Sequence, residues 1–151
     1  MIKYLIILTL LHQNSPLINK IITETNLKSD ELLIIIYQTN GSCTKCFYQP
    51  NYLIEDVMKR VNYRDKVKIM SFVYCDREKE LNIFRKKYNW KHYLLRDDGN
   101  VFKVLKIDKK SILTVMNPKG ELIFNVTDKD NEGASEKLLG VLNQELEKLK
   151  K

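Results

Sequence analysis

The feature that most constrains the fold is a nearly unbroken apolar run, "LLIIIYQ" at residues 32–38, which is followed closely by two cysteines. A run of this length that is rich in β-branched residues predicts a strand buried on both faces, as in a parallel sheet covered by helices. After a turn at residues 39–42, the apolar spacing becomes helical from Cys43 onward. The chain is therefore expected to pass from a buried strand into a helix at Cys43.

The remaining pattern alternates between strands and helices. Ser15 followed by Pro16 is typical of a helix start and opens a predicted helix at residues 16–26. The further expected elements are a strand at 66–75, a helix at 77–90 capped by Asp76, a short strand and helix within 90–107, a hairpin at 111–127 and a helix at 133–150. This order predicts an α/β fold with a mixed central sheet flanked by helices.

Length and charge narrow the class of protein further. The chain has 151 residues and 44% hydrophobic content, which suits one domain with a single core. Its net charge is +7, but the lysines are spread along the whole chain. This distribution indicates a solvated basic surface and not a nucleic-acid interface.

The first fifteen residues allow two interpretations. Lys3, an apolar run at residues 4–11 and a polar "HQNS" resemble a signal peptide, although the usual small-residue cleavage pattern is absent. The alternative is a first buried strand, since a short apolar run does not distinguish the two. The run is too short to span a bilayer as a helix. We therefore expect that residues 1–15 are removed and that the mature domain, 16–151, is not inserted in a membrane. The signal-peptide interpretation predicts an exported protein, for example a periplasmic one. The strand interpretation predicts a cytoplasmic protein.

The cysteine pair has the features of a redox dithiol. Cys43 is expected at the helix N-terminus, where the free N–H groups and the helix dipole stabilise a thiolate. Lys45 adds a positive charge nearby, unless it is simply a solvated lysine. Cys46 follows one turn later, close enough to form a disulfide with Cys43 but more shielded. This asymmetry suits one attacking thiol and one resolving thiol.

Two other interpretations of the pair remain open. It could be a dithiol without function, or it could supply two metal ligands, with Cys75 and His92 as the main further candidates. A structural zinc site needs four ligands, and the chain has no second Cys-x-x-Cys pair. A single cysteine at a strand end, such as Cys75, is more often a small buried apolar residue. His92 is more often expected to be the first residue of a strand than a metal ligand.

The chain resembles the thioredoxin superfamily, and most closely its TlpA-like and redoxin branch of thiol–disulfide oxidoreductases. The resemblance covers residues 31–151 and rests on these segments: "LLIIIYQTNGSCTKC", the in-helix Pro50, "VYCDREKELNIFRKKY", "YLLRDDGNVFKVLKI" and "ILTVMNPKGELIF". It implies a thioredoxin-like fold with the dithiol at the C-terminal edge of the strands. Residues 90–107 would be the extra strand and helix of that branch.

The resemblance also implies a function and site residues. It implies exchange with protein disulfides through Cys43 and Cys46, without an organic cofactor. At the family's buried acid, six residues before the first cysteine, this chain has Tyr37. At the position of the family's cis-proline it has Ser111. Because a cis bond before a residue other than proline costs roughly 2.5–4 kcal/mol, we expect the Lys110–Ser111 bond to be trans.

Two further functions are compatible with this fold. One is a binding module that holds a metal ion or a partner protein with little redox turnover. The other is peroxide reduction, but the Thr and Pro that precede the reactive cysteine of peroxiredoxins are absent here. The sequence leaves the direction of electron transfer and the partner open.

Overall fold

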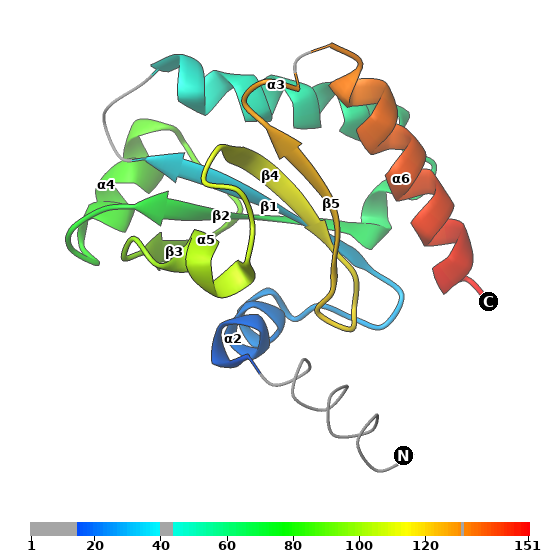
Figure 1. The fold of residues 1–151 in the computed structure, drawn as a ribbon, viewed down its shortest axis with the longest axis horizontal. Coiled ribbons are helices and arrows are strands. Elements are labelled where there is room, and N and C mark those ends of the chain that lie inside the picture. The colour runs from blue at the N-terminus through cyan, green and yellow to red at the C-terminus, as the bar shows by residue number, and fades with distance from the viewer. Residues whose placement is uncertain (1–14, 40–43, 131) are drawn as a thin grey trace.

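The structure is a computed structural model that describes residues 15–39, 44–130 and 132–151. For residues 44–47 it describes the backbone only. A five-stranded sheet lies between two layers of helices (Figure 1). The elements are, in chain order, α2 (Pro16–Thr25), β1 (Leu32–Thr39), α3 (Thr44–Arg60), the 3-10 turn η1 (Arg64–Lys66), β2 (Val67–Tyr74), α4 (Glu80–Lys87), β3 (Tyr93–Asp97), α5 (Val101–Leu105), β4 (Ser111–Met116), β5 (Leu122–Thr127) and α6 (Ala134–Leu149).

The sheet is mixed, with strand order β3-β2-β1-β4-β5. β1 runs parallel to β2 and β2 parallel to β3, whereas β4 is antiparallel to both β1 and β5. The seven residues of β1 before Thr39 are all buried. The predicted mixed sheet, with a buried central strand and an antiparallel hairpin at one edge, is confirmed.

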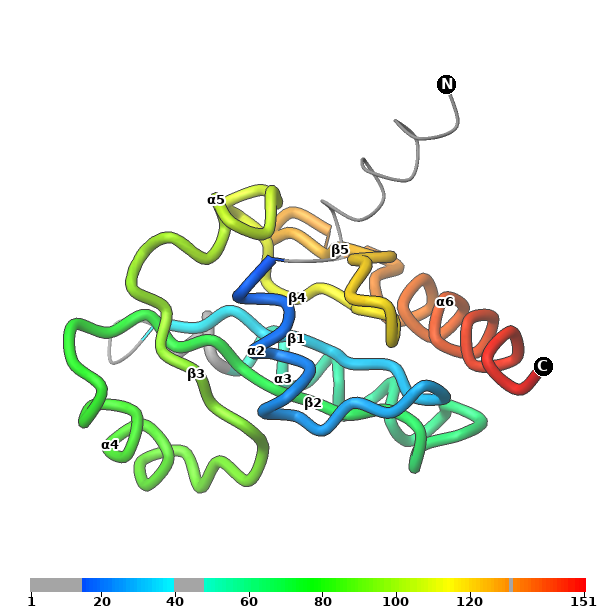
Figure 2. The backbone as a smooth tube through the Cα atoms, turned by 90° about the horizontal axis from the view of Figure 1, so that it is seen from below, coloured from blue at the N-terminus to red at the C-terminus, as the bar shows by residue number. Residues whose placement is uncertain are grey.

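Alternation along β1 divides the interior into two cores. Ile34 and Ile36 point toward α3, α4 and α6, where Val57, Phe84 and Leu142 pack against them. Leu33, Ile35 and Tyr37 point to the opposite face, in the core shared with α2 and α5. In Figure 1, α3 lies above the sheet and α2 and α5 lie below it; Figure 2 views the molecule from below, with α2 crossing in front of the sheet.

The β4–β5 turn is shaped to receive α2. Gly120 has φ +84°, a conformation that glycine adopts without strain. A Cβ at this position would lie 2.5 Å from the Ile18 side chain. The absence of a side chain at Gly120 therefore lets α2 pack against the turn.

The helix after β2 is shorter than predicted. α4 spans Glu80–Lys87 instead of residues 77–90, and its N-cap is Lys79, so the prediction that Asp76 caps it is wrong. The Asp76 N–H instead donates a hydrogen bond of 3.1 Å to the Glu80 carboxylate. At the other end, Asn89 takes a left-handed conformation with φ 48°, which ends the helical path before Trp90.

Among residues 15–39, 44–130 and 132–151, no helix is long and apolar enough to cross a membrane. The signal-peptide and first-strand interpretations concern almost only residues 1–14. These residues lie outside the part of the chain that the structure describes.

Candidate functional site

The candidate site lies at the sheet edge where β1, β2 and β3 end and β4 begins. β1 ends at Thr39 and α3 begins at Thr44, so the chain passes through Cys43 between the central strand and its helix. The backbone of Cys46 lies in the first turn of α3. Cys43 and the side chains of Lys45 and Cys46 are outside the described residues.

A cavity of about 820 Å³ opens at this same edge. Its walls come from the ends of β1 and β2, from β3 and α5, and from the segment that links α5 to β4. Thr39, the last residue of β1, is part of the lining. The cavity is therefore only four residues of chain away from Cys43.

Tyr37 lines the cavity but faces away from α3. It belongs to the core with α2 and α5, where its ring lies 5.1 Å from that of Phe102 and 6.2 Å from that of Phe72. Its hydroxyl shares a hydrogen bond of 2.8 Å with Thr114 Oγ1. Burial raises the pKa of Tyr37 far above its usual value. Tyr37 is thus a neutral, packed residue on the face of the sheet opposite α3.

Gln38 is the residue that occupies the α3 side at the end of β1. Its side-chain oxygen accepts a hydrogen bond of 3.1 Å from Ser71 Oγ. Its Nε2 atom is buried and has no hydrogen-bond partner in the described part of the chain. The sequence analysis did not single out Gln38. Strand alternation places residue 38 on the same face of the sheet as residues 32, 34 and 36, which was the available signal.

Ser111 begins β4 and lines the same cavity as Gln38. The pairing of β4 with β1 reaches Leu113 opposite Ile36, and β4 is irregular between Ser111 and Leu113. Ser111 is only 5% exposed, and its Oγ has no hydrogen-bond partner among residues 15–39, 44–130 and 132–151. No cis peptide bond occurs within these ranges, so the predicted trans Lys110–Ser111 bond is confirmed. Two buried polar side chains, each with an atom that has no hydrogen-bond partner in the described part of the chain, therefore line this edge.

Asp97, at the end of β3, organises the opposite wall of the cavity. It is buried, and its Oδ1 accepts hydrogen bonds from the backbone N–H groups of Gly99 (2.7 Å) and Val101 (3.5 Å). These bonds hold the turn that leads into α5. The sequence analysis identified the turn but not the carboxylate that holds it.

Cys75 has the buried environment predicted for a small apolar residue. It is 4% exposed in the core under α3 and α4, and its thiol donates a hydrogen bond of 3.5 Å to the Arg77 carbonyl. Burial, assisted by the nearby Glu80 carboxylate, raises the pKa of Cys75. A raised pKa keeps this thiol protonated and unreactive near neutral pH.

His92 and Cys75 lie at opposite ends of β3. Tyr93, next to His92, pairs with Met70, whereas Asp97 pairs with Tyr74, next to Cys75. Six residues of strand at about 3.3 Å each place the two positions roughly 20 Å apart. Two ligands of one zinc ion lie about 4 Å apart at most. The structure therefore does not bring Cys75 and His92 together, and no cluster of three His, Cys, Asp or Glu side chains suited to a metal occurs in the described part of the chain.

Comparison with solved structures defines the class of the fold. An uncharacterised thioredoxin-like protein from Porphyromonas gingivalis superposes with TM-score 0.55 at 14% identity, over 81% of this chain and 77% of its own. A thiol:disulfide interchange protein from a Bacteroides species gives TM-score 0.52 at 16% identity, over 75% and 74%. A secreted Mycobacterium tuberculosis disulfide oxidoreductase homologous to E. coli DsbE gives 0.50 at 12% identity, over 79% and 84%.

The chain therefore has a thioredoxin-like fold. No protein-family model and no curated protein sequence matches it. The extra elements β3 and α5 fall within residues 90–107, as predicted.

Proposed function

We propose that the protein is a thiol–disulfide oxidoreductase that acts on protein disulfides through Cys43 and Cys46. The observation that carries this proposal is the position of the Cys-x-x-Cys motif in the fold. The motif spans the passage from the central strand β1 to α3 of a thioredoxin-like fold, at an edge with an open cavity. Solved thiol–disulfide oxidoreductases with this fold support the same class of chemistry.

The proposed reaction is a pair of thiol–disulfide exchanges. The Cys43 thiolate attacks one sulfur of the partner disulfide, forms a mixed disulfide and releases the other partner sulfur as a thiolate. Cys46, after losing its proton to solvent, attacks the Cys43 sulfur and releases the second partner thiolate. Two electrons pass to the partner, and the Cys43–Cys46 disulfide remains. In reverse, the same steps oxidise a partner dithiol.

The start of α3 supports Cys43 as the attacking thiol. α3 has 17 residues, and its first turn contains no acidic residue. A thiolate before this turn would be stabilised by the free N–H groups and the helix dipole without opposition from a carboxylate. Lys45 would add to this stabilisation.

The reduction potential of the Cys43–Cys46 couple tests the proposal. After equilibration in glutathione buffers of graded ratio, alkylation and mass analysis should show one two-electron transition, with about 30 mV for each tenfold change in ratio. We expect a potential between about −270 and −120 mV, the range from thioredoxin to DsbA. A Cys75→Ala control should leave it unchanged. If no Cys43–Cys46 disulfide forms even in the most oxidising buffer, the protein is a thioredoxin-like binding module instead.

We further propose that the protein is exported. The signal-like pattern of residues 1–15 supports this, and the M. tuberculosis protein with the same fold is described as secreted. Mass spectrometry of the protein from its native host should find an N-terminus near residue 16. Recovery of the mature protein with Met1 intact would contradict cleavage and favour a cytoplasmic location.

A further inference from the structure

We infer that the cavity at the sheet edge selects partner proteins by charge: it receives an apolar side chain of the partner and places an adjacent acidic side chain against three lysines. This inference rests on the proposed function, since the partner segment would be the one that carries the disulfide. It adds a substrate class, namely cysteines flanked by an apolar and an acidic residue.

The walls of the cavity provide the apolar part of the site. The rings of Tyr37 and Phe102 form one wall, and Ile107 and Ile112 belong to another. Tyr74 is 46% exposed at the end of β2, so its ring is available for contact. The volume of about 820 Å³ is more than one partner side chain requires, so a segment of a few residues can enter.

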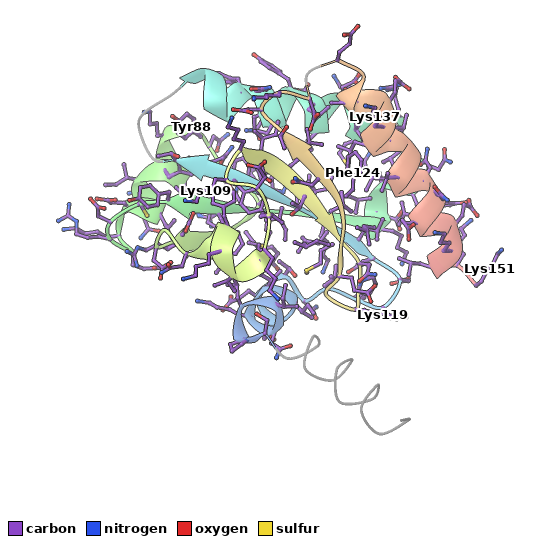
Figure 3. All side chains as sticks on the ribbon, in the orientation of Figure 1. Tyr88, Lys109, Lys119, Phe124, Lys137 and Lys151 are labelled. Carbon is purple, nitrogen blue, oxygen red and sulfur yellow. The ribbon has the colours of Figure 1, made fainter. Side chains whose placement is uncertain are left out.

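The charged groups around the cavity favour an anion. Lys103, Lys109 and Lys110 line it, and none of them has an ion pair in the described part of the chain. Two acidic residues, Asp97 and Asp128, also line it. Among the lining residues, three lysines against two aspartates leave one positive charge in excess. The Asp97 carboxylate already accepts hydrogen bonds from the backbone before α5, and the carboxylate of Asp108, just outside the lining, accepts one from the Lys110 N–H. In Figure 3, Lys109 lies near the C-terminal end of β1.

Two buried polar residues also belong to the lining. Gln38 and Ser111 both line the cavity, at 7% and 5% exposure. The Gln38 Nε2 and the Ser111 Oγ have no hydrogen-bond partner within residues 15–39, 44–130 and 132–151. Both atoms are shielded, so they are not part of the surface that a partner first meets. The cavity thus combines apolar walls with an excess of positive charge among its lining residues.

The test uses three short peptides that differ in one residue. Each carries a cysteine blocked as a mixed disulfide with 2-mercaptoethanol, followed by leucine and then by glutamate, glutamine or lysine. With reduced wild-type protein at low salt, we expect the glutamate peptide to react about fivefold faster than the lysine peptide, because each unscreened charge pair at this range contributes about a factor of three. Rates with dithiothreitol correct for the intrinsic reactivity of each peptide.

The matched variants replace lysines by glutamine. A Lys103→Gln, Lys109→Gln, Lys110→Gln triple variant should lower the glutamate-to-lysine ratio to below two, whereas Lys119→Gln, in the β4–β5 turn at the other end of the sheet, should leave it unchanged. The ratio is the decisive readout, because a change in thiol reactivity would alter all three rates together. Equal rates for the three peptides in the wild type, or an unchanged ratio in the triple variant, would overturn the inference while leaving the oxidoreductase function standing.

A binding measurement separates this inference from the chemistry. The Cys43→Ser, Cys46→Ser double variant is titrated with fluorescent peptides in which serine replaces the blocked cysteine. Tighter binding of the glutamate peptide than of the lysine peptide supports the cavity as an anionic docking site even if the wild type reduces no disulfide, an outcome that would overturn the proposed function alone. Equal binding of the two peptides would contradict the inference.

Discussion

A Cys46→Ser variant is expected to accumulate covalent complexes with partner proteins, and a Cys43→Ser variant is expected to trap at least tenfold less. The physical reason is the order of the two exchanges: Cys43 makes the mixed disulfide, and Cys46 resolves it. Without Cys46 the first step still occurs and its product persists. Acid quenching of cells followed by non-reducing electrophoresis and mass spectrometry would measure the trapped complexes.

The third cysteine supplies the matched control for this experiment. Cys75 is buried and hydrogen-bonded to the Arg77 carbonyl, so Cys75→Ser should trap no more than the wild type. Equal trapping by the Cys43 and Cys46 variants would contradict the assignment of roles. Trapping by neither would contradict the dithiol mechanism itself.

A Tyr37→Phe variant is expected to lose roughly 1–3 kcal/mol of unfolding free energy, although its ring remains in place. The change removes the hydroxyl that shares the 2.8 Å hydrogen bond with Thr114 Oγ1. Thr114 is fully buried, so its hydroxyl would be left without this partner. Denaturant unfolding, monitored by circular dichroism, measures the loss.

The double variant Tyr37→Phe, Thr114→Val provides the control. Replacing both partners by apolar groups of similar shape removes the unpaired hydroxyl, so most of the lost stability should return. If the double variant is less stable than either single variant, the hydrogen bond is not the source of the effect. Because Tyr37 is a neutral packed residue, neither variant should change the pKa of Cys43 in the reduced protein.

Several elements could be predicted from the sequence because their signals are local. The apolar run at residues 32–38 predicts a strand with both faces covered, and β1 is buried on both faces. Pro118 and Gly120 mark the hairpin between β4 and β5, and the leucine spacing marks α6. The helix after β2 was predicted too long, since helix ends depend on caps and on residues such as Asn89 that leave the helical path.

What the sequence determined by itself was the order of strands and helices and the position of the Cys-x-x-Cys motif between a buried strand and a helix. Only the tertiary structure decided which side chains surround that position. The pairing of β1 with β4 brings Gln38 and Ser111, which are far apart in sequence, to the same cavity, and strand alternation turns Tyr37 to the face opposite α3. The parallel pairing of β2 and β3 likewise separates Cys75 from His92. Local periodicity encodes whether a residue is in a strand or a helix, whereas proximity between distant residues depends on strand order and register, which arise only when the whole sheet is packed.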